Sequence, residues 1–218
     1  MRFAWFTLGS LGFATIPGAA QQSKAGQPGP RALLARADEV ALARSAAPAS
    51  VSTGARILVL TDAGFVVADS GTTDVVCVVN RSWPTSLEPE CYDAEAAATI
   101  MPMELRRTEL LHRGVPADVV NREVDAGLSA GTFRLPSRPA VAYMMSAEQR
   151  LVSDEGRPVG KWRPHLMIYS PFLTNAAVGH HGEPNLTGGM VVDPGRPTAN
   201  LMVVVPDFVP RSAPRPSP

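Results

Sequence analysis

Two adjacent histidines stand out among the residues whose types and spacing could do chemistry. His180 and His181 lie just before Glu183 in a glycine-rich loop. Two imidazoles and a carboxylate form a ligand set for a borderline metal such as zinc or copper. Adjacent histidines rarely bind one ion with good geometry, so a solvated loop without metal is the alternative interpretation.

The other two histidines lie at the predicted ends of secondary-structure elements. His165 opens an apolar stretch after Pro164. It could act as a catalytic base at a strand end, or be a core or edge histidine satisfied by hydrogen bonds. His112 lies in the last turn of a predicted helix, where a cation complements the helix dipole, so we interpret it as structural.

The densest group of polar side chains runs from Glu88 to Glu95 and also contains Glu90 and Asp93. Asp93 and Glu95 are candidates for the general acid and base of a small hydrolase that also uses His165. Alternatively, these acids cap the helix that follows and face solvent, because an acid at a helix N-terminus needs no further explanation.

Motifs that would identify a reaction or a cofactor are missing. The chain contains no His-Glu-x-x-His, Cys-x-x-Cys or Gly-x-Gly-x-x-Gly sequence. Its Gly-x-Ser-x-Gly sequence, Gly127 to Gly131, lies at the end of a predicted helix, whereas the hydrolase motif needs a turn from a strand into a helix. The stretch from Gly156 to Lys161 resembles a phosphate-binding loop, but it is one residue short and its lysine precedes Trp162. The sequence therefore predicts neither a cofactor nor a reaction.

The N-terminus has the three parts of a secretory signal peptide. Arg2 precedes an apolar stretch, Phe3 to Ile16, and the small residues Gly18 to Ala20 follow. The alternative is a membrane anchor, but a spanning helix needs roughly 20 apolar residues, and this stretch is shorter and interrupted. We therefore expect residues 1–20 to be cleaved, the protein to be periplasmic or extracellular, and no membrane span to remain.

The two cysteines, Cys77 and Cys91, lie 14 positions apart. In an oxidising compartment an even number of cysteines favours a disulfide. The alternative is two small buried apolar residues that never meet. Because we expect export, we predict the disulfide.

Composition limits the domain organisation and the partners. The chain has 20 basic and 20 acidic residues, so no excess charge favours a nucleic-acid partner. Residues 21–30 are a polar glycine- and proline-containing leader that we expect to be flexible, and residues 206–218 are a proline-rich tail that we expect not to pack. Residues 31–205 are long enough for one domain.

The periodicity of apolar residues predicts an α+β domain with a largely antiparallel sheet. An N-terminal helix over 31–44 precedes an antiparallel meander, and a central helical hairpin precedes the remaining strands. The expected strands and hairpin helices cover residues 56–60, 65–67, 75–79, 102–114, 116–128, 140–145, a hairpin across 154–156, 165–169, 190–192 and 201–205.

Four segments carry a resemblance to a known family. Cys77 to Trp83, Pro89 to Glu95, Arg138 to Ser146 and Pro164 to Pro171 resemble a family of uncharacterised exported bacterial proteins of unknown function. The resemblance spans most of residues 57–205. It implies export and a single domain, and it implies no activity or site.

Three functions remain open. The leading hypothesis is an exported, non-catalytic binding or accessory protein, because strand geometry predicts that His165 and the loop from Thr174 to Gly189 start over 15 Å apart. This separation favours two polar neighbourhoods over one catalytic group. The alternatives are the hydrolase using His165 with Asp93 or Glu95, and the metal-binding protein using His180, His181 and Glu183.

The signal peptide gives the first testable prediction. Sequencing the N-terminus of protein recovered from the periplasm or medium should find a start near Gln21. An intact Met1 on the recovered protein would contradict cleavage.

Overall fold

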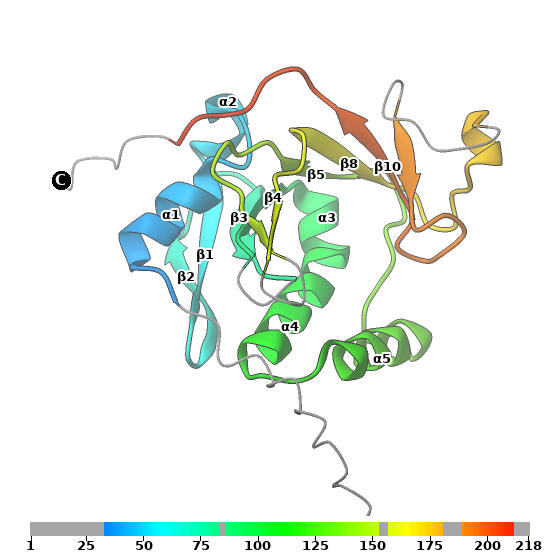
Figure 1. Cartoon of the computed structure of the whole chain (residues 1–218), viewed down its shortest axis with the longest axis horizontal. Helices are drawn as coiled ribbons and strands as arrows, with labels where there is room; N and C mark the ends of the chain where they lie inside the picture. Colours follow the sequence, from blue (N-terminus) through cyan, green and yellow to red (C-terminus); the bar gives the residue numbers. More distant parts are fainter. Residues whose placement is uncertain (1–32, 83–85, 153–156, 181–188, 212–218) are drawn as a thin grey trace, which may run out of the picture.

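The computed structural model describes residues 33–82, 86–152, 157–180 and 189–211 (Figure 1). The predicted signal peptide and leader, residues 1–30, lie outside these ranges. The helices are α1 (Arg36–Arg44), α2 (Ala49–Ser52), α3 (Ala94–Thr99), α4 (Met101–His112) and α5 (Ala117–Ser129), with the 3-10 turn η1 (Ala176–Val178). The strands are β1 (Arg56–Thr61), β2 (Gly64–Asp69), β3 (Val76–Asn80), β4 (Glu88–Tyr92), β5 (Ala140–Met144), β6 (Leu151–Val152), β7 (Pro158–Gly160), β8 (His165–Tyr169), β9 (Met190–Val192) and β10 (Asn200–Val204).

Eight strands form one sheet in the order β2-β1-β3-β4-β5-β8-β10-β9, and β6 and β7 form a separate hairpin. Every neighbouring pair in the large sheet is antiparallel except β1 and β3, which are parallel. The predicted α+β class with a largely antiparallel sheet is therefore confirmed. Among the helices of the described ranges, none has both the length and the hydrophobicity of a bilayer span.

The parallel pairing of β1 and β3 corrects the predicted three-stranded meander. After β2, the chain returns to the start of β1, where Thr72 N donates to Gly54 O at 2.7 Å and Arg56 N donates to Val75 O at 2.8 Å. Gly71 has φ +66°, and a Cβ there would lie 2.4 Å from the backbone nitrogen of Arg56. Only glycine fits this close turn, which makes β3 start beside the start of β1 and run in the same direction.

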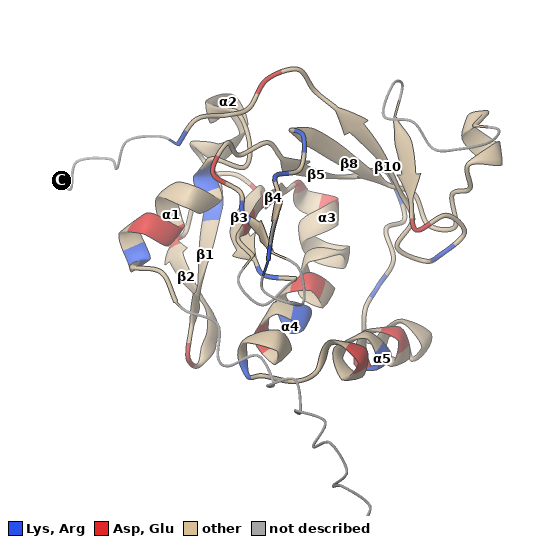
Figure 2. Ribbon diagram, in the orientation of Figure 1, with Lys and Arg blue, Asp and Glu red and all other residues tan. Residues whose placement is uncertain are grey.

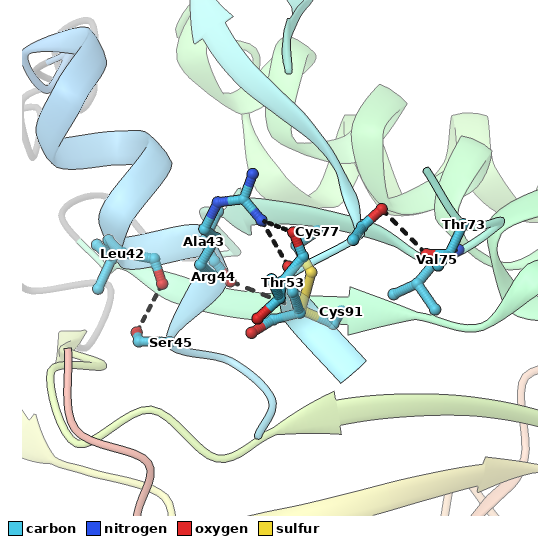
Figure 3. Close-up of a disulfide and its surroundings, with 11 residues drawn as sticks. Leu42, Ala43, Arg44, Ser45, Thr53, Thr73, Val75, Cys77 and Cys91 are labelled. Carbon is cyan, nitrogen blue, oxygen red and sulfur yellow. Dashed lines mark hydrogen bonds between the residues drawn. A yellow bond between two sulfur atoms is a disulfide. The ribbon is translucent and has the colours of Figure 1, made fainter. Parts of the chain in front are cut away.

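Strand β4 corrects a second expectation, because the strands predicted from the sequence do not include residues 88–92. All five residues of β4 are buried, and the strand pairs with β3 on one side and β5 on the other. Cys91 is directly opposite Cys77, with a Cα–Cα distance of 4.0 Å, and the predicted disulfide joins them. Figure 3 shows it beside Ala43 at the end of α1, whose carbonyl oxygen lies 3.6 Å from Cys91 Sγ.

Helices cover both faces of the sheet (Figure 1). On one face α1 and α2 pack on β1, β3 and β4. On the other face α3 and α4 pack on β3, β4 and β5, and α5 packs against α4 and adds Val124 to the same core. The buried residues of the first core are Leu42, Ala43, Ala46, Ala47, Ala55, Ile57, Val59, Cys77, Val79 and Cys91. Those of the second core are Val78, Tyr92, Ala96, Ile100, Met103, Val124, Ala140, Ala142 and Tyr169.

The first part of the predicted tail lies against the domain. Val209 N donates to Met145 O at 2.8 Å, and Ala147 N donates to Val209 O at 3.1 Å. Arg211 forms ion pairs with Asp38 and Glu148. These contacts hold the chain against the domain as far as residue 211, whereas the sequence predicts that packing ends at residue 205.

A buried ion pair attaches α1 to the sheet. Glu39 and Arg81 are 0% and 1% exposed, and two guanidinium nitrogens donate to the two carboxylate oxygens at 3.2 and 2.9 Å. Glu39 also accepts from Leu60 N at 2.9 Å, and Arg81 also donates to Val79 O at 2.8 Å. Both charges are satisfied by several hydrogen bonds, which a buried pair requires.

Breaking this pair should strongly destabilise the fold. Arg81→Met leaves the Glu39 charge buried without its cation, and we expect a loss of about 3–5 kcal/mol in urea unfolding. Arg122→Met is the matched control, because its ion pair with Asp118 is exposed and should contribute at most about 1 kcal/mol. Equal losses in the two variants would contradict this role for Arg81.

Candidate functional site

Strand β4 places two carboxyl groups and a phenol on the face that α4 covers. Side chains alternate along a strand, so Glu88, Glu90 and Tyr92 share one face and the disulfide lies on the other. They are 5%, 6% and 0% exposed. Carboxyl groups are rarely buried to this extent without partners, so their contacts matter.

Each buried glutamate has its own hydrogen-bond partners. The Tyr92 hydroxyl donates to Glu90 Oε2 and accepts from Asn80 Nδ2 at 2.7 Å. Glu88 accepts from the backbone nitrogen of Ser82 at 3.0 Å and from its hydroxyl at 2.7 Å. The two carboxyl groups therefore lie in one region but do not share a partner.

Burial raises the pKa of Glu90 to about 8. The negative charges of Glu104 and Glu88 act in the same direction, while the hydrogen bond from Tyr92 acts against it. At neutral pH Glu90 is consequently a carboxylic acid for most of the time. In this form it has a hydrogen-bond donor as well as an acceptor.

Helix α4 and strand β8 add two more groups to this region. Burial raises the pKa of Glu104, Arg107 at 3.3 Å lowers it, and the charges of Glu88 and Asp193 raise it further. Burial also raises the pKa of Tyr169, as do the charges of Glu90, Glu104 and Asp193. We call these five groups the buried carboxyl cluster: Glu88, Glu90, Tyr92, Glu104 and Tyr169. Four of them are buried, and the side chain of Glu104 is 21% exposed.

An open cleft lies beside this cluster, between α4, α5 and the turn that joins β9 to β10. Its volume is about 340 Å³, within the range of small-molecule sites. Figure 2 shows acidic and basic residues both on α5 and on that turn. We call it the α5 cleft, and its lining residues are Arg107, Asn121, Val124, Asp125, Leu128, Asp193, Arg196 and Thr198.

Two basic and two acidic residues line the α5 cleft, and Glu104, which pairs with Arg107 from outside this lining, leaves one acid in excess. Arg107 is paired with Glu104 and donates to Asn121 Oδ1 at 2.5 Å, and Arg196 is paired with Asp125 at 2.9 Å. Within the described ranges the Asp193 side chain has only the Thr198 hydroxyl, at 3.3 Å, and no basic partner. Because its charge also raises the pKa of Glu104 and Tyr169, Asp193 connects the cleft electrostatically with the buried carboxyl cluster.

The structure does not bring His165 to Asp93 or Glu95. His165 is opposite Met144 on β5, whereas Asp93 N donates to Val141 O, three residues along β5 and on its other side. Strand spacings put His165 and Asp93 about 14 Å apart. His165 is 3% exposed, its Nδ1 lies 2.6 Å from Arg163 O, and burial lowers its pKa.

The two acids proposed as partners of His165 support local structure. Asp93 is the N-cap of α3, where its carboxylate accepts from Ala96 N at 2.7 Å. Glu95 accepts from Ser137 N at 2.9 Å and from Arg138 Nε at 2.9 Å, and these contacts lower the pKa of its carboxyl. Asp93 therefore caps a helix, as the alternative interpretation expected. Glu88 and Glu90 do not face solvent as that interpretation expected, because both are buried.

Of the proposed metal ligands, only His180 lies within the described residues. It follows η1, and its backbone nitrogen donates to Asn175 O at 2.9 Å. His181 and Glu183 lie outside the described ranges, and inside those ranges no three His, Cys, Asp or Glu side chains are placed to hold a metal ion. The metal hypothesis remains a prediction. His112 lies in the last turn of α4, where the sequence places it.

Sequence reasoning missed Glu90 as a buried acid, and it missed Glu104 and Asp193 altogether. The period-two spacing of Glu88, Glu90 and Tyr92 is the available signal for a strand with one polar face. Asp193 begins an Asp-Pro-Gly turn, and nothing local distinguishes it from an ordinary turn residue.

The raised pKa of Glu90 predicts a pH-dependent stability. Between its ordinary value of 4.5 and about 8, the unfolded chain has lost the proton that the folded chain keeps, so stability falls as pH rises through this window. Glu90→Gln removes this titration. Between about pH 5 and about pH 8 the variant should lose less stability than the native chain, by an amount on the order of a few kcal/mol in urea unfolding.

Glu95→Gln is the control, because the pKa of Glu95 is lowered and its titration lies below this window. Its stability should therefore change between the two pH values as that of the native chain does. A Glu90→Gln variant with the native pH dependence would show that Glu90 is ionised in the folded state.

Comparisons with models of protein families, with curated proteins and with solved structures return no match to this chain. Similarity therefore assigns no function to the α5 cleft. What the protein does has to be inferred from the geometry and the charges of its own residues.

Proposed function

We propose that this protein is exported and binds a small polar ligand in the α5 cleft without transforming it. The observation that carries the proposal is the position of Asp193, an acid without a basic partner among the described residues, in the wall of an open cleft of about 340 Å³. Small-molecule sites combine such a volume with a few polar groups that orient the ligand. Asp193 would accept hydrogen bonds from the ligand or pair with its positive charge.

Export is supported by two features. Residues 1–20 have the pattern of a cleavable signal peptide, and the Cys77–Cys91 disulfide suits an oxidising compartment such as the periplasm or the extracellular space. The resemblance to exported bacterial proteins points the same way.

The positions of the buried acidic groups relative to the α5 cleft favour binding over catalysis. Catalysis by acid and base needs groups within hydrogen-bonding reach of one reacting atom. Glu90 and Tyr92 bond to each other, and neither belongs to the lining of the α5 cleft. They would influence a ligand through charge and hydrogen-bonded structure rather than by transferring a proton to it.

The hydrolase alternative gains no support from the geometry. Asp93 caps α3, Glu95 binds Ser137 and Arg138, and His165 lies on a different part of the sheet. A shared site would require these groups to leave their present partners.

A ligand screen on two matched variants tests the proposal. Amino acids, amines, polyols and dicarboxylates are screened against the mature protein by thermal shift, and compounds that stabilise it are measured by calorimetry. Asp193→Asn should weaken binding at least about tenfold, because it removes the unpaired charge. Asn also tolerates the positive φ of Asp193, so the turn is kept.

Asp118→Asn is the control, since it makes the same charge change on the exposed side of α5. Its affinities should equal those of the native protein. No stabilising compound, or equal affinities in Asp193→Asn and the native protein, would overturn the proposal.

A further inference from the structure

A second cavity adjoins the α5 cleft. It has a volume of about 360 Å³ and shares Asp125, Leu128 and Arg196 with the cleft. Its other lining residues are Ser129, Leu135, Phe172 and Pro197. The two cavities are therefore the halves of one groove, divided by the ion pair between Arg196 and Asp125, and the second half is the more apolar.

Two hydrogen-bonded turns form the wall of the groove opposite α5. Phe172 N donates to Arg196 O at 2.9 Å, and Gly195 N donates to Leu173 O at 2.7 Å, so the turn after β8 and the turn after β9 support each other. Each turn holds one non-glycine residue with positive φ, Phe172 at 64° and Asp193 at 50°. They are the only such residues in the described part of the chain, and side chains other than those of Asn and Asp rarely adopt this conformation.

One of these two positions holds an aromatic ring and the other a carboxylate, so together they select a ligand with an apolar end and a polar end. Phe172 lines the apolar half and is 58% exposed, so a ligand could cover much of its ring. Asp193 lines the polar half. A single ligand crossing the ion pair would meet a ring at one end of the groove and a carboxylate at the other.

The charge at the polar end favours a cation over an anion. Both arginines of the groove already have acidic partners, Arg107 with Glu104 and Arg196 with Asp125, so neither is free to bind an anion. The charge left over belongs to Asp193. A cation there would also face the side of the cleft where Glu104 lies, whose pKa the negative charges of Glu88 and Asp193 raise.

We infer that the groove binds an amphipathic amine, with its ammonium group at Asp193 and its apolar group against Phe172, Leu135 and Pro197. This inference rests on the proposed binding function and names its ligand class. Burial of an aromatic or branched aliphatic group supplies affinity, and the paired charge supplies the orientation. The occupant is a small molecule, because the two halves together have the volume of a small-molecule site.

Three probes of one shape and different charge test the ligand class. They are 2-phenylethylamine, 2-phenylethanol and phenylacetate, each titrated calorimetrically into the mature protein. We expect the amine to bind at least about tenfold more tightly than the alcohol, and the carboxylate to bind more weakly than either. Added salt should weaken the binding of the amine more than that of the alcohol.

Two variants separate the two ends of the groove. Asp193→Asn should bring the affinity for the amine down to that for the alcohol. Phe172→Gly removes the ring, suits the positive φ, and should weaken both probes by a similar factor. Phe208→Gly is its control, because Phe208 is also exposed (41%) but lines neither half of the groove. Circular dichroism checks that each variant is folded.

The outcomes separate this inference from the proposed function. If phenylacetate binds more tightly than the amine and Asp193→Asn strengthens it, the ligand class is wrong while the groove still binds ligands. Equal affinities for amine and alcohol in the native protein also overturn the ligand class. Failure of these probes and of every compound in the wider screen overturns both.

Discussion

The central position of β4 is the constraint on which the rest of the structure depends. The strand is paired on both sides and joined to β3 by the Cys77–Cys91 disulfide, so its register cannot shift. A shift by one residue would move Cys91 to the other face and break the bond. With Cys91 facing α1, alternation leaves Glu88, Glu90 and Tyr92 no direction except the face under α4.

The buried acids then determine what their neighbours must do. Tyr92 donates to Glu90 and itself accepts from Asn80, Ser82 donates to Glu88, and Arg107 offsets part of the charge of Glu104. On the opposite face, the only buried charged side chains in the described chain are Glu39 and Arg81. They pair with each other, so they leave no excess charge. The acidic groups are thus concentrated on the side of the sheet where α4, α5 and the turn after β9 leave an open groove.

The sequence was informative where periodicity and turn residues act locally. The strands over 165–169 and 190–192 have the predicted bounds, the helical hairpin appears as α4 and α5, and the cysteine pairing is confirmed. It was misleading where long-range packing decides. Residues 88–92 are not predicted as a strand, because they contain two glutamates and Pro89, which are unusual in a buried strand. Burial of these acids depends on partners such as Tyr92 and Asn80, and no local sequence pattern predicts those contacts. The groove joins α5 to turns far along the chain, so Asp193 and Phe172 could not be recognised together.

The electrostatic connection between the groove and the buried acids is the central claim, and a carboxyl titration tests it directly. The side-chain carbon of Glu104 is followed by ¹³C NMR over pH in the native protein and in Asp193→Asn. We expect the pKa of Glu104 to lie above its ordinary value in the native protein and to fall when the charge of Asp193 is removed. An identical pKa in both proteins would contradict the account, because the groove and the buried carboxyl cluster would then be electrostatically independent.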